Sequence, residues 1–456
     1  MKGRALQVFL VTLTILFLLV VAFATWLLVE RTDHDWSKWL STAAFVFIVV
    51  FVSFLILRIV FFSVFAVIHL LLYRRRLARD DRSGRWDERS APFVSIIVPA
   101  FNEEKVIGEA VRSHLDMDYP ALEVVVVDDG SADRTAEMAR EVAEKERPGR
   151  IQVHKVPNAG KGNALNYGIQ KAKGDLLLCV DADSRLDPDS LRYAVRHMKD
   201  PKVGAVAGNV KVLNRHKIIT KLQALEYIVG QNLMRRILGL FGIVGIVPGP
   251  FGLFRRQALE EVGYYTDDTF AEDCDLSLRL LAGGWRIVDE INAVVRTEAP
   301  EKLLPFIKQR YRWTRGVLQS LRKHKRGFAG AYGFRVWFLL ANMFFEGVVW
   351  PTANLLAHLC VFYLILEFGL VTYLVFWWIH FTLLDMGLAL FCIASEREDA
   401  RLVVHVLILR VSFLVVMDVC KLLSSCEEVF RVQMGWGKLE RTGSGGAAPK
   451  PKEVPA

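Results

Sequence analysis

The sequence predicts an α/β domain with a mixed, mainly parallel sheet, inserted between N- and C-terminal transmembrane α-helices. The chain has 456 residues, 53% of them hydrophobic, with a mean hydropathy of +0.28, which is more apolar than a soluble globular protein usually is. Long apolar runs occur near both ends, and short apolar runs alternate with helix-like stretches between them. Such alternation is typical of parallel sheets with crossover helices.

Two apolar runs near the N-terminus predict two transmembrane helices. Leu6–Val29 is long enough to cross a hydrocarbon core of about 30 Å, and it is longer than the core of a typical signal peptide, with no small-x-small cleavage site at its end. The second run, Leu40–Tyr73, is interrupted by Arg58 and His69. We expect these two side chains to snorkel or to lie at an interfacial helix end.

Arginines predict the orientation of this pair. Several follow the second run directly: Arg74, Arg75, Arg76, Arg79, Arg82, Arg85 and Arg89. An excess of Lys and Arg beside a span marks the cytoplasmic side, so the N-terminus and residues 91–330 are predicted to face the cytosol of a multi-pass plasma-membrane protein. The same excess accounts for most of the net charge of +9, and we therefore expect no nucleic-acid binding.

Three further apolar stretches follow the central domain. They are Val336–Phe368, Val371–Ala394 and Leu402–Leu423. Three or four spans fit them equally well, which leaves the side of the C-terminus open. The predicted organisation is two helices and a basic linker (1–90), a cytosolic domain (91–330), C-terminal spans (331–430) and a tail (431–456) that is partly disordered, with the composition of a disordered end after Gly443.

The central domain has a clear order of strand and helix patterns. Strands are predicted at Phe93–Pro99, Glu123–Val127, Ile151–Val156 and Asp175–Val180, and helices at Glu103–Leu115, Asp133–Glu144 and Asn163–Lys173. Continuous apolar strands joined by helices imply parallel pairing with right-handed crossovers. Ligands bind such sheets beyond the carboxyl ends of the strands.

Polar and acidic residues collect at that predicted edge. One strand runs into AFNEE at 100–104, the next into DDGS at 128–131, and a third into DAD at 181–183. Neither GxGxxG nor GxxxxGK[ST] occurs, so the sequence supports neither a dinucleotide site nor a P-loop.

The pair Asp181 and Asp183 is the best candidate metal site. On an extended chain, side chains at i and i+2 point the same way, and two carboxylates together with diphosphate oxygens suit Mg²⁺ or Mn²⁺. A lone pair of this kind is also common in solvated turns. In DDGS, Asp129 is a candidate to accept the N3–H of uracil, with a tight turn as the alternative.

These motifs, followed by AEDCDL at 271–276 and QRYRW at 309–313, resemble the family 2 glycosyltransferases over residues 93 to 320. That family consists of inverting enzymes with a GT-A fold. The resemblance is strongest to its membrane-embedded processive members, the synthases of cellulose, chitin oligosaccharide, hyaluronan and poly-N-acetylglucosamine.

The resemblance implies a role for each motif. Asp129 would bind the nucleotide, and Asp181 and Asp183 would bind metal and diphosphate. AED replaces the family's TED, so the Thr is absent, but Glu272 and Asp273 remain and Asp273 would be the catalytic base. The family's QxxRW motif corresponds without change to the residues Gln309, Arg312 and Trp313.

Physical chemistry is consistent with these roles. Transfer from a diphosphate needs a base for the acceptor hydroxyl and charge neutralisation of the leaving group, although Asp273 could also be a helix cap. Gln309, Arg312 and Trp313 are spaced i, i+3, i+4 on one helical face, where a guanidinium suits phosphate and an indole suits a sugar. A membrane-surface helix is the alternative, supported by Lys308, Arg310 and Arg315.

Weaker motifs complete the predicted site. Lys161 in NAGKGNALN (158–166) would approach the diphosphate, unless it is an ordinary solvated lysine. GPFGLFRRQAL (249–259) resembles an acceptor-side loop, with glycines that permit close approach of a sugar chain; ordinary use of the glycines in turns is the alternative. The remaining candidates are donor-side residues at the first strand end and the two loop glycines: Pro99, Ala100, Asn102, Glu103, Gly249 and Gly252.

The sequence therefore predicts an inverting polysaccharide synthase that uses a UDP-sugar, with UDP-N-acetylglucosamine slightly favoured, and passes the polymer through its own spans. A growing polysaccharide or lipid acceptor, membrane lipids and accessory secretion subunits are the expected partners. Two alternatives remain open: a single-transfer enzyme acting on a polyprenyl phosphate or membrane lipid, and a non-catalytic nucleotide-binding scaffold or transporter.

Overall fold

The computed structural model describes residues 36–82, 91–146, 149–369 and 371–432. They divide into two compact units, which are considered separately. Among the described residues, one unit contains 36–68 together with Val348–Leu422, and the other contains those of His69–Gly347 together with 423–432. The predicted first transmembrane helix, Leu6–Val29, lies outside the described residues.

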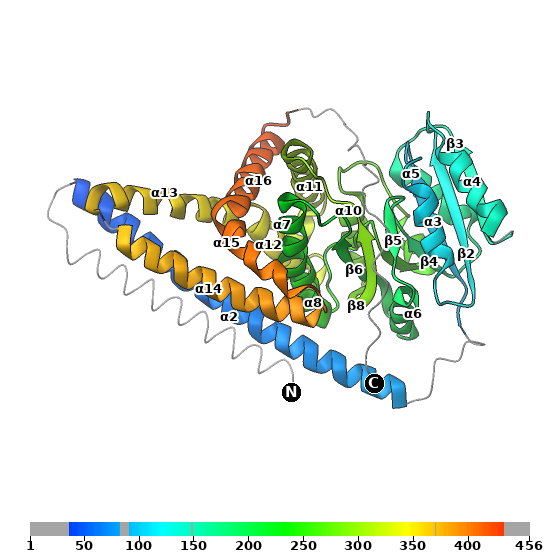
Figure 1. Cartoon of the computed structure of the whole chain (residues 1–456), viewed down its shortest axis with the longest axis horizontal. Coiled ribbons are helices and arrows are strands. Elements are labelled where there is room, and N and C mark those ends of the chain that lie inside the picture. Colours follow the sequence, from blue (N-terminus) through cyan, green and yellow to red (C-terminus); the bar gives the residue numbers. More distant parts are fainter. Residues whose placement is uncertain (1–35, 83–90, 147–148, 370, 433–456) are drawn as a thin grey trace. The chain divides into compact units, whose positions relative to one another are not determined.

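The second unit is built on a single eight-stranded sheet of order β3-β2-β1-β4-β7-β6-β8-β5 (Figure 1). The strands are β1 (Val94–Ala100), β2 (Leu122–Asp129), β3 (Ile151–Val156), β4 (Leu176–Cys179), β5 (Ser184–Leu186), β6 (Val203–Val212), β7 (Gly252–Arg255) and β8 (Arg286–Thr297). Four neighbouring pairs are parallel and three are antiparallel. The prediction of a mixed α/β sheet is confirmed.

Ten α-helices of this unit surround or follow the sheet. They are α3 (Ile107–Leu115), α4 (Thr135–Glu146), α5 (Lys161–Lys171), α6 (Ser190–Val195), α7 (Ile218–Glu226), α8 (Leu233–Leu240), α9 (Arg256–Val262), α10 (Glu272–Ala282), α11 (Leu303–Lys323) and α12 (Gly333–Phe344). Shorter turns are η2 (Arg196–Lys199), η3 (Tyr227–Asn232) and η4 (Lys325–Ala329).

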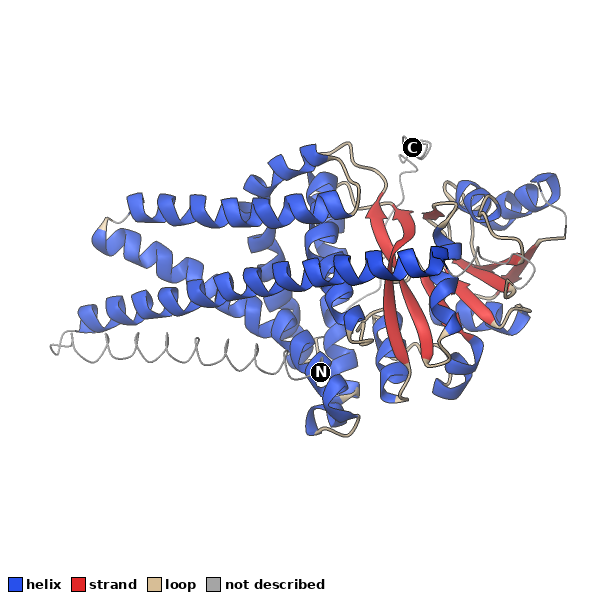
Figure 2. Ribbon diagram, turned by 90° about the horizontal axis from the view of Figure 1, so that it is seen from below, coloured by secondary structure: helices blue, strands red, loops and turns tan. Residues whose placement is uncertain are grey.

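Alternate residues along the central strands enter two different hydrophobic cores. In β1, Ile96 packs in a cluster with α3 and α6, whereas Ile97 packs on the opposite face with α5, α9 and α10. Both side chains are fully buried. Figure 2 shows helices on both sides of the strands, so the strands need apolar side chains at every position, as their continuous apolar sequence predicted.

The strand order reverses direction between β1 and β4. From β1 the chain moves outward through β2 to β3, and α5 then carries it back to β4, which pairs with the other edge of β1. The loops that follow β1 and β4 therefore diverge at this point. Such a reversal is where open α/β sheets bind ligands.

The first unit consists of helices with long apolar segments. It holds most of α2 (Trp36–Arg82), then α13 (Trp350–Phe368), α14 (Val371–Ser395), η6 (Ala400–His405), α15 (Val406–Ile408), η7 (Leu409–Phe413) and the greater part of α16 (Leu414–Val429); η5 (Phe345–Val349) precedes α13. Among the described residues, two segments are long and apolar enough to cross a membrane, Lys38–Arg76 and Gly333–Phe368, and Phe381–Ser395 is a shorter apolar helix.

The two polar interruptions of the second apolar run both contact other side chains of the protein. The Arg58 guanidinium lies 4.5 Å from the ring centroid of Trp350 within the helical unit. His69 belongs to the other unit, where it is buried and its Nε2 lies 3.6 Å from an Asp289 carboxylate oxygen. His69 therefore does not snorkel, because its ring is buried within the protein beside Asp289. The alternative of an interfacial helix end stays a prediction.

Candidate active site

The loops after β1 and β2 are tied together by hydrogen bonds. The Asn102 backbone N–H donates to Ser131 Oγ at 2.8 Å, and the Asn102 side-chain oxygen accepts from the Ala132 N–H at 2.9 Å. The Glu103 N–H donates to Thr135 Oγ1 at 2.8 Å. Asn102 has a φ of 51°, a conformation that Asn tolerates better than most residues. These contacts fix the path of the predicted donor-side segment, whereas Pro99 and Ala100 lie buried within β1.

Asp129 holds a second loop in place. Its buried carboxylate accepts hydrogen bonds from the backbone N–H groups of Ala159 (2.9 Å) and Gly160 (3.0 Å). The following residue, Gly130, has a φ of +74°, and a Cβ there would lie 2.7 Å from the Asn158 nitrogen. Asp129 thus shapes the loop that leads into α5, in addition to any contact with a nucleotide.

Lys161, the first residue of α5, joins two acidic motifs. Its Nζ lies 2.8 Å from Asp181 Oδ1 and 2.9 Å from Glu272 Oε1. A Cβ on Gly249 would fall 2.9 Å from this ammonium and 3.1 Å from Asp181. The structure therefore brings together four predicted site residues from separate parts of the chain.

Burial and neighbouring charges shift the pKa values of Lys161 and Asp273. Removal from water lowers the pKa of Lys161, but the carboxylates of Asp181 and Glu272 outweigh that effect and the net shift is upward. For Asp273, burial and then the neighbouring Glu272 raise the pKa to about 6, against the opposing effects of Lys161 and the Cys274 N–H. A carboxyl group with a pKa near 6 is suited to accept a proton at neutral pH.

Asp181 and Asp183 are arranged differently from the prediction. β4 ends at Cys179, and the Ser184 N–H donates to the Asp181 carbonyl at 3.0 Å, which makes a turn of residues 181–184. Asp183 is buried, and its Oδ1 accepts from the hydroxyls of Ser184 and Thr297, each at 3.2 Å. The extended geometry expected for the pair is wrong, because the chain must turn here to enter β5.

The donor set still fits a divalent cation shared with a diphosphate. Across the described part of the chain, no group of three or more His, Cys, Asp and Glu side chains could hold a metal ion. Asp181 and Asp183 offer two carboxylates, and Mg²⁺ is commonly held by one or two carboxylates with phosphate and water oxygens completing its shell.

The QRYRW segment lies in the long helix α11. Gln309 is buried, and Trp313 is partly buried against the core cluster that contains Ile96. The Arg310 guanidinium covers one face of the Trp313 indole at 4.3 Å from the ring centroid, and it pairs with Glu226 at 2.6 Å. Arg310 no longer supports the alternative of a helix lying on the membrane surface, since its side chain is buried.

A close helix contact places this segment beside Asp273. A Cβ on Gly316 would lie 2.5 Å from the Ala271 Cβ and 2.6 Å from its backbone nitrogen. The Phe270 N–H also donates to Gln319 Oε1 at 3.0 Å. Because only glycine allows this approach, α11 passes the loop before Asp273 one turn beyond Trp313.

Two buried carboxylates that the sequence prediction missed stabilise α11. Asp275 is fully buried and contacts Arg279 (2.8 Å), Lys323 (3.0 Å) and His324 (2.9 Å). Glu428, also buried, accepts from Arg315 and Gln319, each at 3.1 Å. Two patterns could have suggested Asp275: its i, i+4 spacing to Arg279, and the Lys323–His324 pair at the end of the helix. No local pattern indicates Glu428.

Gly252, the second glycine of the expected acceptor-side loop, lies within the sheet between β4 and β6. It is buried in β7, where it pairs with Cys179 of β4, and a Cβ would lie 2.6 Å from the Phe254 ring. Its glycine is required by packing within the sheet rather than by an open acceptor loop.

Comparison with known proteins agrees with this arrangement. The family described as "Glycosyltransferase like family 2" matches residues 91–316, the segment that contains the sheet, the carboxylate cluster and the QRYRW helix. The domain belongs to glycosyltransferase family 2.

Its relatives include polysaccharide synthases. The chain is 34% identical over 270 residues to a poly-β-1,6-N-acetyl-D-glucosamine synthase of Staphylococcus aureus, a match that covers 58% of this chain and 65% of the relative. The Staphylococcus epidermidis protein of the same name is 34% identical over 224 residues, covering 49% of this chain and 54% of the relative. The chain thus matches less than two thirds of the length of these relatives.

A solved structure supports the GT-A type of fold for the family 2 domain. The mannosyltransferase PcManGT from Pyrobaculum calidifontis, determined in complex with GDP-Man and Mn2+, is 22% identical and superposes with a TM-score of 0.56. The superposition covers 82% of this chain and 99% of the mannosyltransferase. At this level of identity the similarity concerns the fold.

Proposed function

We propose that this chain is a membrane-embedded, inverting glycosyltransferase that polymerises sugar from a UDP-sugar into a β-linked polysaccharide and moves the polymer through its own spans. UDP-N-acetylglucosamine is the favoured donor, in line with the activity named for the staphylococcal relatives. The catalytic domain would face the cytoplasm, between two N-terminal and three or four C-terminal spans.

The observation that carries the proposal is the position of Asp273. Burial and Glu272 raise its pKa, Glu272 pairs with the same Lys161 that pairs with Asp181, and Gly316 of α11 packs against Ala271. These contacts support a base near both the predicted metal motif and the QRYRW helix. An inverting transfer needs one base for the acceptor hydroxyl, close to where the diphosphate departs. We assign that role to Asp273.

The neighbouring residues have supporting roles. Glu272 pairs with Lys161, so it would position the ammonium rather than take the acceptor proton. When the donor diphosphate enters, Lys161 can exchange its carboxylate partners for phosphate oxygens, and a Mg²⁺ or Mn²⁺ ion held by Asp181 and Asp183 would neutralise the leaving group. Arg312 would contribute a further positive charge, and Asp129 would bind the uracil while it holds the 159–160 loop.

A donor screen with product sizing tests the proposal. The full-length protein in lipid nanodiscs is incubated with UDP-N-acetylglucosamine, UDP-glucose or UDP-glucuronate, and UDP release and product length are measured. We expect UDP release and long chains with the first donor. A product that is a lipid with one sugar would support the single-transfer alternative, and no release with any donor would support a non-catalytic protein.

Trp313→Ala should reduce transfer by roughly ten- to a hundredfold, because a misplaced acceptor loses its proximity advantage. Arg310 covers one indole face, so a sugar would stack on the other. UDP-sugar binding, measured by calorimetry, should change little. Trp313→Phe retains an aromatic face and should recover much of the activity; equal losses in both variants would argue against a stacking role.

Asp183→Asn should abolish metal-dependent transfer, because a neutral amide is a poor ligand for a hard cation. The fold should persist, since the amide oxygen can still accept from Ser184 and Thr297. Binding of Mn²⁺ in the presence of UDP, followed by electron paramagnetic resonance, provides the direct measurement. Asp189→Asn, an exposed change at the start of α6, is the control, and turnover near that of the wild type in Asp183→Asn would refute the metal assignment.

A further inference from the structure

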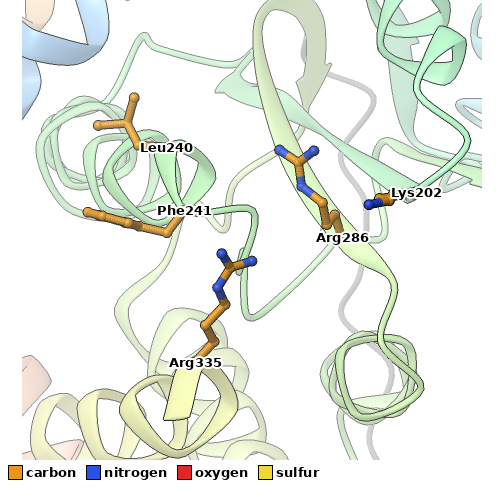
Figure 3. Close-up of a pocket in the computed structure, with 5 residues that line it drawn as sticks. All are labelled: Lys202, Leu240, Phe241, Arg286 and Arg335. Atoms are coloured by element: carbon orange, nitrogen blue, oxygen red, sulfur yellow. The ribbon is translucent and has the colours of Figure 1, made fainter. Parts of the chain in front are cut away.

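A cationic pocket lies apart from the residues of the candidate active site. It has a volume of about 390 Å³ and is lined by Lys202, Leu240, Phe241, Arg286 and Arg335. Figure 3 shows the Arg335 guanidinium directed toward the space between Phe241 and Arg286. The lining residues come from the entry to β6, the end of α8, the start of β8 and the first turn of α12.

The charge of this pocket is unbalanced. Arg286 donates to Asp200 at 2.7 Å. Within the part of the chain that the structure describes, the side chains of Lys202 and Arg335 form no ion pair. The Asp200 carboxylate is therefore paired with one of three cations, Arg286, and the other two are Lys202 and Arg335. Guanidinium and ammonium groups gathered in this way are suited to phosphate oxygens, which accept several charge-assisted hydrogen bonds.

The remaining surroundings are apolar and adjoin a candidate span. Leu240 and Phe241 form one side of the pocket, and Arg335 lies near the start of the span Gly333–Phe368. Beside Arg335 are three exposed aromatic side chains, Phe334 (74% exposed), Trp337 and Phe338, with the first two stacked at 5.7 Å. Aromatic and basic side chains at the end of a span are typical of the lipid headgroup region.

We propose that this pocket binds the phosphate of an anionic membrane phospholipid, whose acyl chains lie against Leu240, Phe241 and the exposed aromatics of α12. Lys202 and Arg335 carry the positive charge that Asp200 does not neutralise. The inference rests on the membrane location proposed above and not on the transfer reaction. A lipid-binding measurement therefore gives a result whether or not the protein makes a polymer.

The test compares two double variants of the full-length protein that lose the same charge. Lys202→Gln/Arg335→Gln removes the free cations of the pocket, while Lys325→Gln/Arg326→Gln removes two exposed cations from η4, outside the pocket. Each purified protein is incubated with phosphatidylglycerol, and retained lipid is counted by native mass spectrometry. We expect retention to fall roughly tenfold or more in the pocket variant, because basic residues near a membrane surface add to the affinity for anionic lipid, and little in the control.

Competition with soluble ligands distinguishes the source of the phosphate. Phosphatidylglycerol bound to the wild type should resist inorganic phosphate and glycerol phosphate, and phosphatidylcholine should not replace it. Displacement by either soluble ligand would overturn the lipid assignment in favour of a free phosphate. Equal retention in the two double variants would overturn the site itself.

Discussion

Asp273→Asn is expected to lower the rate of sugar transfer by about a hundredfold or more while UDP affinity stays nearly unchanged. The substitution removes the base for the acceptor hydroxyl, whereas the proposed donor contacts of Asp181 and Lys161 remain. Single-turnover transfer and calorimetric UDP binding are the measurements. A parallel collapse of UDP affinity would make Asp273 a nucleotide-binding or structural residue.

The pH dependence provides a second measurement of the same role. Burial and Glu272 raise the pKa of Asp273 to about 6. As the pH falls through that value, the Asp273 carboxylate becomes protonated and can no longer accept the proton of the acceptor hydroxyl. The kcat/KM of the wild type should therefore decline below about pH 6, and the residual activity of Asp273→Asn should lack that limb. A wild-type profile that is flat from pH 5 to 7 would contradict the assignment.

Stability measurements separate lost chemistry from lost folding. The folded pKa of Asp273 lies above the ordinary value of about 3.9, so its ionisation opposes folding above that pH. Asp273→Asn should consequently be at least as stable as the wild type at pH 7. Asp267→Asn, an exposed change in the loop before α10, is the control and should keep normal activity.

The sequence predicted the first half of the domain well, since its signals are local. Continuous apolar runs must be buried on both faces, and the strand at Ile151–Val156 has the predicted bounds. The helix predicted from Glu103 begins instead at Ile107, after a turn at residues 104–106 and a non-helical φ of −124° at Val106. The preceding residues Asn102 and Glu103 are held by Ser131 and Thr135, and no local preference contains those tertiary contacts.

Motif order identified the candidate site residues, but their partners depend on the fold. Lys161 follows from a loop motif, yet its pairing with Glu272 joins residues that are far apart in the chain. The turn at Asp181–Ser184 is imposed by the pairing of β5 with β8. Gly316 has no sequence pattern of its own, since its need for glycine comes from Ala271 across the interface between α10 and α11.

Asp275→Ala should destabilise the domain more than any of the aspartate substitutions discussed above. Asp275 is fully buried against Arg279, Lys323 and His324. Its removal leaves the largely buried Arg279 guanidinium and His324 ring without their carboxylate partner, while Lys323 keeps Asp268. Breaking such a site by removing one partner costs about 3–5 kcal/mol, which corresponds to a fall in the unfolding midpoint of roughly 10 °C for a domain of this size. Thermal unfolding in detergent checks this.

Asp268 provides a matched control, because its exposed carboxylate pairs with the same Lys323 at 2.8 Å. Asp268→Ala should cost less than about 1 kcal/mol, as exposed ion pairs usually do. Similar losses in the two variants would contradict a special role for the buried site.

The contribution of Asp275 to the stability of the folded state should also decrease at low pH. Burial favours the neutral acid, but hydrogen bonds from His324, Lys323 and Arg279 outweigh it and hold the pKa of Asp275 below its ordinary value. The carboxylate therefore stabilises the folded state above about pH 4, and this stabilisation is lost as the pH falls toward the folded pKa. The difference in stability between wild type and Asp275→Ala should narrow only below about pH 4. Because Asp275 joins the start of α10 to the end of α11, the variant should also lose transfer activity at temperatures where it remains folded, as Asp273 and Trp313 are no longer held in register.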